Sequence, residues 1–166
     1  QSSRGTSRIA PRGKGTTMTS GKMTIGDILE VKGNQAWSVS PGATVLEAIQ
    51  TMAEKNVGAL LVTDGEKLVG IISERDYTRK VALKGKASRD TAVREILSED
   101  VVHVTPAHTV EECMRLMTDR RIRHLPVLRE GKIAGVVSIG DLVNAIISNQ
   151  STTIQQLQTY ISGVPN

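Results

Sequence analysis

The stretch "VSPGATVLEAIQTMAEKNVGALLVTDGEKLVGIISERD", residues 39–76, is repeated with changes later in the chain. The second copy is "VTPAHTVEECMRLMTDRRIRHLPVLREGKIAGVVSIGD", residues 104–141, which begins 65 residues later and aligns without a gap. Twelve of the 38 aligned positions are identical. An ungapped match of this length indicates one structural unit that is used twice.

Each copy predicts a helix that begins at a capping box. Thr44 is followed three residues later by Glu47, and Thr109 by Glu112. In this pattern the two side chains satisfy backbone N–H groups at the start of a helix. Apolar residues then recur in the second copy with the spacing of one helical face: Val110, Cys113, Met114 and Met117. Cys113 is therefore predicted to pack in the core.

After each helix, two apolar runs joined by a turn predict a β-hairpin. The runs cover 59–63 and 67–73 in the first copy, and 124–128 and 132–138 in the second. A second helical segment follows each hairpin. The order strand, helix, strand, strand, helix in both copies predicts an α+β fold.

Ser138, in "GVVSIGD", does not stand in the Gly-x-Ser-x-Gly pattern of a hydrolase nucleophile. Ser73 and Ser138 instead precede Asp76 and Asp141 by three residues, which places each serine at the N-cap of the closing helix. His-Glu-x-x-His and Cys-x-x-Cys patterns are absent from the sequence. We therefore expect no enzyme and no metal site.

The repeated pattern resembles a tandem pair of CBS domains, the cystathionine-β-synthase-type module also called a Bateman module. The runs "NVGALLV", "ERDYTRK" and "RIRHLPV" are similar to those of short stand-alone bacterial members and their plant organellar relatives. The resemblance implies two CBS units, 23–88 and 89–148, packed as a pseudo-two-fold pair. It further implies regulatory, non-catalytic binding of an adenosine-containing ligand such as AMP, ATP, NAD or S-adenosylmethionine in clefts between the units.

The aspartates suit a ribose better than a phosphate. A helix N-terminus attracts anions, but a carboxylate at its third position repels a phosphate there. A ribose offers two hydroxyl donors to one carboxylate, and the serine hydroxyl can bond the same sugar. Ser73 with Asp76 and Ser138 with Asp141 are the expected ribose sites, although each pair also suits an ordinary helix cap.

The remaining site residues follow in part from the resemblance (Arg123, His124, Gly58 and Ala59) and in part from their places in the sequence. Arg123 and His124 match positions that hold phosphate, and binding is expected to weaken as the pH rises through the His124 pKa. Arg75 is expected to serve a phosphate in the first copy. The lack of bulk at Gly58 and Ala59 leaves room for adenine. Apolar cleft walls are expected from four residues: Ala36, Ile72, Val102 and Val137. Trp37 suits either the core or a cleft, and the core is favoured.

The charge does not favour nucleic acid. The net charge is +4, but 5 of the 21 basic residues lie in 1–22, which leaves 16 basic against 17 acidic residues in the rest. Stacking aromatics are few, with 1 Trp, 2 Tyr and 0 Phe. Residues 1–22 are rich in Ser, Thr and Gly, and they are predicted to be a disordered leader or an added segment. The single cysteine and the lack of a long apolar run favour a cytoplasmic protein without a membrane span.

Residues 149–166 predict a C-terminal amphipathic helix, with Ile154, Leu157 and Ile161 on one side. This helix suits docking onto the body or onto a second copy, and CBS pairs commonly associate in twos, so we expect a homodimer. The sequence does not identify the regulated protein partner. An interaction module with vestigial clefts that bind no nucleotide is the alternative function.

Overall fold

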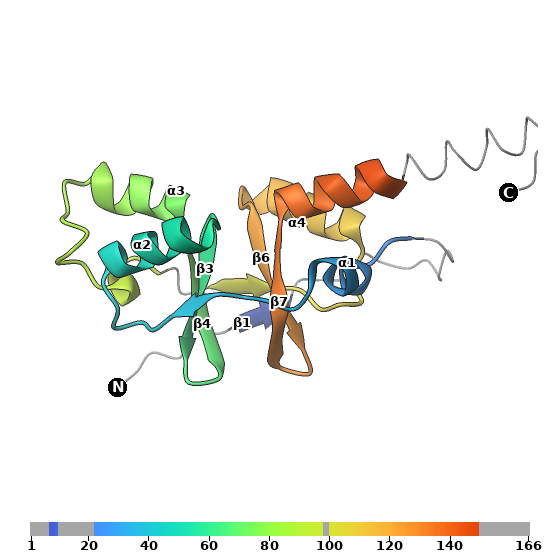
Figure 1. Ribbon diagram of the computed structural model, residues 1–166, viewed down its shortest axis with the longest axis horizontal. Coiled ribbons are helices and arrows are strands. Elements are labelled where there is room, and N and C mark those ends of the chain that lie inside the picture. The colour runs from blue at the N-terminus through green and yellow to red at the C-terminus, as the bar shows by residue number, and fades with distance from the viewer. Residues whose placement is uncertain (1–6, 10–21, 98–99, 150–166) are drawn as a thin grey trace, which may run out of the picture.

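The computed structural model of the chain describes residues 7–9, 22–97 and 100–149 (Figure 1). The elements are β1 (Ser7–Ile9), α1 (Ile25–Lys32), β2 (Ser38–Val39), α2 (Val45–Lys55), β3 (Ala59–Asp64), β4 (Lys67–Ser73), α3 (Glu74–Tyr77), the π-helical η1 (Thr78–Ala82), the 3₁₀ turn η2 (Val93–Glu95), β5 (Val101–His103), α4 (Val110–Arg120), β6 (His124–Arg129) and β7 (Lys132–Ser138). Residues 139–149 are helical. The predicted α+β fold is confirmed.

The two central helices begin and end in the same way. Thr44 Oγ1 accepts a hydrogen bond from the Glu47 N–H at 3.1 Å, and Thr109 Oγ1 accepts one from the Glu112 N–H at 3.1 Å. Both predicted capping boxes therefore form. Helices α2 and α4 end at Asn56 and Arg121 respectively, each in the left-handed conformation with φ 55°. The repeat seen in the sequence is thus a repeat of backbone geometry.

The two hairpins also share one register. β3 pairs with β4 and β6 with β7 in antiparallel fashion, and each ladder has an irregularity at the equivalent place, Val62/Thr63 and Val127/Leu128. Ala59 lies opposite Ser73, and His124 lies opposite Ser138. The first residue of each hairpin is therefore held beside the serine that caps the closing helix.

Helix α1 packs on the second unit, although it precedes the first unit in sequence. Ile25, Ile28 and Leu29 are buried in the cluster that contains Leu125 and Val137. Figure 1 shows α1 beside α4 and β7, away from α2 and β3. The segment that precedes the second unit packs in turn on the first, where Val93 is buried. Each unit is completed by the segment that precedes the other unit.

Equivalent backbone hydrogen bonds attach the two exchanged segments. The Val110 N–H donates to Met23 O at 3.0 Å, and the Val45 N–H donates to Thr91 O at 2.8 Å. A Cβ atom at Gly135 would lie only 2.9 Å from Leu29 Cδ2. The same atom at Gly70 would lie 3.0 Å from Leu97 Cδ2. These two glycines, identical in the repeat, let the exchanged segments lie close against the hairpins.

A third cluster joins the two units. Leu61 and Leu68 from the first unit are buried against Val101 and Leu128 from the second. Apolar burial of this kind favours association of the two units. Together with the equivalent hairpins, the cluster agrees with the pseudo-two-fold pair expected from the sequence.

Cys113 is fully buried in the core of the second unit. Burial raises the pKa of its thiol to about 12, and Glu112 adds to the effect. The thiol therefore stays protonated and unreactive at neutral pH. The packing role predicted for Cys113 is confirmed.

The N-terminal leader contributes a strand. Ser7–Ile9 pairs in parallel with Val101–His103, so these three residues depart from the disorder predicted for 1–22. Apart from residue 149, the C-terminal segment predicted to form an amphipathic helix lies outside the described residues. Within the described ranges, no helix is long and apolar enough to cross a membrane.

Candidate ligand-binding site

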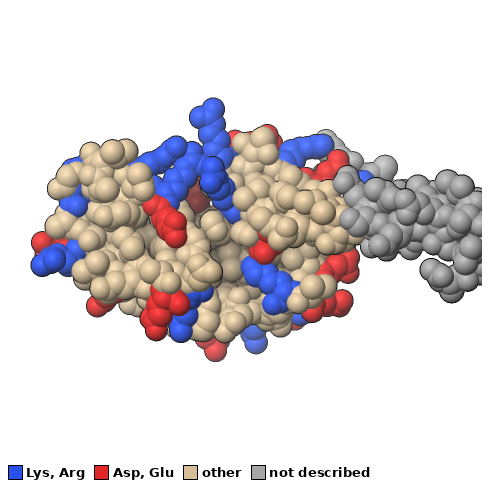
Figure 2. Space-filling view, turned by 45° about the horizontal axis from the view of Figure 1, so that its top comes forward, with Lys and Arg blue, Asp and Glu red and all other residues tan. Residues whose placement is uncertain are grey.

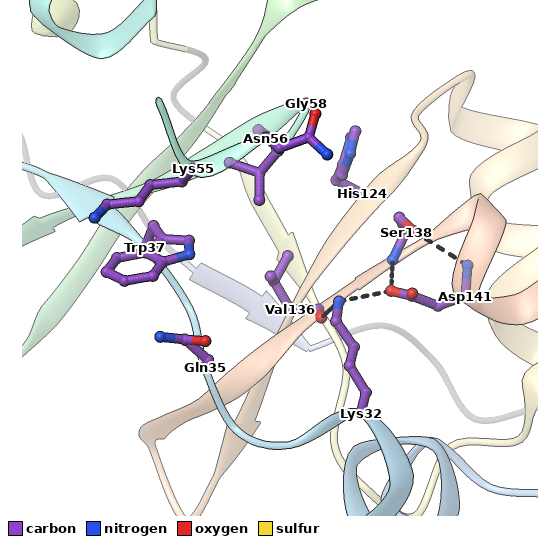
Figure 3. A pocket seen from close by; sticks show the side chains of 12 residues that line it. Lys32, Gln35, Trp37, Lys55, Asn56, Gly58, His124, Val136, Ser138 and Asp141 are labelled. Atoms are coloured by element: carbon purple, nitrogen blue, oxygen red, sulfur yellow. Dashed lines mark hydrogen bonds and ion pairs between the residues drawn. The ribbon is translucent and has the colours of Figure 1, made fainter. Parts of the chain in front are cut away.

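A cavity of about 430 Å³ opens where the two units meet, and Figure 3 shows its lining side chains. The first unit contributes its wall from the end of α2 and the start of β3, and the second contributes β6, β7 and the start of the closing helix. The lining residues are Lys32, Gln35, Trp37, Lys55, Asn56, Val57, Gly58, Ala59, His124, Val136, Ser138 and Asp141. Five predicted site residues are therefore brought together here: Gly58, Ala59, His124, Ser138 and Asp141.

Ser138 and Asp141 cap the closing helix and also face the cavity. The Ser138 N–H donates to Asp141 Oδ2 at 2.8 Å, and the Asp141 N–H donates to Ser138 Oγ at 3.2 Å. These reciprocal hydrogen bonds fix the carboxylate at the cavity wall. The capping role and a ligand role are compatible in this geometry, because a carboxylate has further acceptor positions.

Lys32 is a cavity residue that the sequence analysis did not predict. It lies in the last turn of α1, and its Nζ donates to Asp141 Oδ2 at 2.7 Å and to Val136 O at 2.8 Å (Figure 3). Burial alone would raise the pKa of Asp141, but the hydrogen bonds from Lys32 and Ser138 outweigh it and leave that pKa below its usual value. Asp141 is therefore ionised and already paired at neutral pH.

His124 lies between the two units. A Cβ atom at Gly58 would lie 3.3 Å from His124 Nε2, so the imidazole packs against the backbone of the first unit. Burial lowers the pKa of His124, and the nearby Lys32 ammonium lowers it further. A bound phosphate would have to offset both effects to hold the imidazole in its charged form.

The two arginines predicted to hold phosphate do not line this cavity. Arg123 is exposed, and its carbonyl accepts a hydrogen bond from the Ile139 N–H at 2.8 Å. Arg75 reaches across to the second unit, where its Nη1 donates to Arg121 O at 3.1 Å. Arg75 thus tethers the units in this structure. Lys and Arg side chains gather along the helical edge above the junction of the units (Figure 2).

Ile72 and Val137, which were predicted to form apolar walls, do not line this cavity. Both side chains are buried in the unit cores, with exposures of 1% and 0%. Side chains alternate across a strand, so the neighbouring Val136 points to the cavity instead. Ala36 and Val102 pack against buried clusters and do not line the cavity either.

The first unit holds an equivalent Ser and Asp pair that lies outside this cavity. The Ser73 N–H and Oγ donate to Asp76 Oδ2 at 2.9 Å and 3.0 Å. Lys80, from the same helical segment, lies 3.4 Å from Asp76 Oδ1. The two aspartates are thus paired with lysines from different parts of the chain, so the two candidate clefts differ.

Trp37 is half-buried and serves both of the roles considered for it. Its ring packs against the core of the first unit and lines the cavity. Lys55 Nζ lies 4.3 Å from the ring centroid, within the range of a cation–π contact. The Trp37 ring therefore forms an aromatic wall on the side of the cavity opposite Asp141 (Figure 3).

Among the described residues, no group of three or more His, Cys, Asp and Glu side chains could hold a metal ion. The cavity is instead lined by three basic side chains, one carboxylate and an aromatic ring. Such a mixture of polar groups and a stacking surface suits a small polar ligand with an aromatic part.

A family model for the CBS domain matches residues 25–83 and 93–148. The chain belongs to the CBS domain family. The mitochondrial CBS domain-containing protein CBSX3 of Arabidopsis thaliana is 41% identical over 150 residues, which cover 84% of this chain and 72% of the relative. Because this CBS relative is mitochondrial, the cytoplasmic location of our chain stays a prediction.

Solved CBS structures agree with the fold. A protein with CBS domains from Burkholderia ambifaria MC40-6 is 46% identical, with a TM-score of 0.74 over 77% of this chain and 96% of that chain. The CBS domain pair of protein MJ0100, in complex with 5′-methylthioadenosine and S-adenosyl-L-methionine, is 22% identical with a TM-score of 0.67 over 76% of this chain and 98% of that chain. The latter likeness concerns the fold alone.

Proposed function

We propose that this CBS pair is a non-catalytic regulatory module that binds an adenosine-containing ligand in the cavity beside Asp141. One observation carries the proposal. Ser138, Asp141 and His124 of the second unit face Gly58 and the neighbouring backbone of the first unit across a cavity large enough for a nucleotide. A ligand there contacts both units at once, so its binding is linked to how the units pack.

Each part of an adenylate finds a chemically suitable surface. Asp141 and Ser138 take the ribose hydroxyls, since a carboxylate accepts from both at once. The adenine ring lies against Gly58 and Ala59, where backbone groups can read its edge, with Trp37 as a stacking wall. His124 stands where it can bind a phosphate when protonated.

The cavity suits adenosine-containing ligands as a class. The MJ0100 pair binds adenosine derivatives, which supports an adenosine ligand without naming it. AMP or NAD is our proposal for the Asp141 cleft. Asp76 with Ser73 is the proposed ribose site of a second, nonequivalent cleft, whose phosphate Arg75 would reach only by releasing Arg121 O.

Assembly as a homodimer and an unidentified regulated protein remain part of the proposal. Val143 and Ile147 lie four residues apart in the helical segment 139–149 and are 39% and 55% exposed. Residues with this spacing share one helix face. An apolar face of this kind supports a contact with a second copy.

A specific observation also favours the alternative of a vestigial cleft. The Asp141 carboxylate already has two partners within the chain, because Lys32 Nζ and the Ser138 N–H both donate to its Oδ2. A chain that used its clefts only for structure would show such an internal pair.

A thermal-shift panel separates these functions. The panel contains AMP, ADP, ATP, NAD, NADH and S-adenosylmethionine, each at about a hundredfold excess over its dissociation constant. A bound ligand then adds about 2.7 kcal/mol to the free energy of unfolding. For a chain of this size that raises Tm by roughly 5–11 °C, at about 2–4 °C per kcal/mol. An unchanged Tm with every compound, supported by calorimetry, contradicts the proposal and favours the vestigial cleft.

A further inference from the structure

Lys32 is held in the cavity by the packing of α1. Ile25, Ile28 and Leu29 anchor this helix in the core of the second unit, and the missing side chain of Gly135 lets Leu29 lie close. The last turn of α1 therefore stands at the cavity edge. From there the lysine side chain reaches inward to Asp141 and to the carbonyl of Val136 (Figure 3).

The Lys32 ammonium occupies the carboxylate that the ligand would use. Lys32 Nζ is 2.7 Å from Asp141 Oδ2, and the two side chains are 33% and 24% exposed. Because the Ser138 N–H also donates to Oδ2, a ribose whose two hydroxyls use both carboxylate oxygens would compete with Lys32 for this atom. A neutral sugar would then replace a charge-assisted hydrogen bond with neutral donors, which are weaker partners for a carboxylate.

Opening the pair leaves the Lys32 ammonium without its carboxylate in a cavity that a second lysine also lines. Once released, Lys32 keeps the Val136 carbonyl, while Lys55 lines the same cavity. A partly buried ammonium without an anion is unfavourable. A ligand that brings its own anion near the ribose removes this cost, and the flexible four-carbon stem of lysine can follow that anion.

We propose that Lys32 is a specificity-determining residue that leaves Asp141 for the phosphate of the ligand, so that this cleft selects phosphorylated adenosine over adenosine. The proposal rests on the proposed function, because it concerns the same site. It adds that a neutral nucleoside, or a cationic one such as S-adenosylmethionine, binds this cleft poorly while Lys32 is present.

The first unit pairs its aspartate with a different lysine. Asp76 Oδ1 lies 3.4 Å from Lys80 Nζ, four residues away in the same helical segment. Lys32 instead comes from an exchanged segment and is 109 residues from Asp141. The proposed selection by an exchanged lysine therefore concerns the Asp141 cleft.

The test compares AMP with adenosine by isothermal titration calorimetry, using the full chain and its Lys32→Met variant. Methionine keeps a long unbranched side chain but removes the charge. We expect AMP affinity to fall by at least about tenfold, because the phosphate loses a charged partner. Adenosine affinity should rise about threefold or more, because Asp141 is no longer occupied. Lys32→Arg, which keeps the charge, should preserve the preference for AMP.

Lys22→Met is the matched control. It removes the same charge from an exposed ion pair with Glu111, at 3.9 Å, and should change neither affinity. An equal fall of both affinities in Lys32→Met, or no change in either, overturns the role of Lys32 and leaves the proposed function standing. Absence of binding of both compounds to the unaltered chain overturns the proposed function, and this inference with it.

Discussion

Asp141→Asn is expected to reduce the AMP-induced rise in Tm strongly. The carboxylate accepts both ribose hydroxyls in the proposed complex, whereas the amide offers one acceptor oxygen and a competing donor group. Hydrogen bonds to a charged group contribute about 1.5–3 kcal/mol, so affinity should fall roughly ten- to hundredfold. The measurement is the AMP titration of Tm, with calorimetry to give the affinity.

Asparagine at this position also removes the ion pair with Lys32. The Tm of the variant without AMP is therefore measured as well, and the AMP-induced change is taken relative to it. Asp76→Asn is the matched control. Asp76 forms the same capping geometry with Ser73 but does not line the cavity around Asp141. It should leave the AMP response of the Asp141 cleft, followed by the fluorescence of Trp37 in that cavity, unchanged. An unaltered AMP affinity in Asp141→Asn rules out the proposed ribose site.

Ile25→Ala is expected to destabilise the protein by about 2–5 kcal/mol, the usual cost of truncating a fully buried large aliphatic side chain. Ile25, the first residue of α1, is 0% exposed. It packs in the core of the second unit, whose other residues lie far from α1 in the sequence. Tm should fall by several degrees, at about 2–4 °C per kcal/mol. Denaturant unfolding measures the change in free energy directly.

Val31→Ala serves as the control on the same helix. Its side chain is 92% exposed, so the substitution should change the free energy of unfolding by no more than about 0.5 kcal/mol. A loss below about 1 kcal/mol in Ile25→Ala would mean that α1 does not complete the second unit. In that case the placement of Lys32 at the cavity would lose its structural support.

Much of the fold could be predicted because its signals are local and occur twice. Thr44 and Thr109 cap the starts of helices through hydrogen bonds to residues only three positions later in the sequence. Ser73 and Ser138 do the same for the closing helices. The hairpins follow from short apolar runs joined by turns. The ungapped repeat then shows that both sets form the same unit, which also places Asp76 and Asp141 at equivalent positions.

The parts that sequence reasoning missed depend on long-range contacts. Lys32 lies outside the aligned repeat, and its partner Asp141 is 109 residues away, so nothing in the local pattern links them. Val136 and Val137 are both apolar, and burial on both faces of the strand gives no alternation to show which one faces the cavity. Arg75 bonds a carbonyl of the other unit, a contact that no spacing indicates.

Trp37 provides the most direct measurement of the central claim, that an adenosine ligand binds in the cavity between the two units. It is the only tryptophan of the chain and lines that cavity, so its fluorescence reports on the site. In a titration with AMP we predict a saturable change in Trp37 emission that fits one AMP per chain and that needs at least about tenfold more AMP in Asp141→Asn. Emission that stays constant while AMP is added to saturating concentration, or that changes equally in Asp141→Asn, would contradict the account.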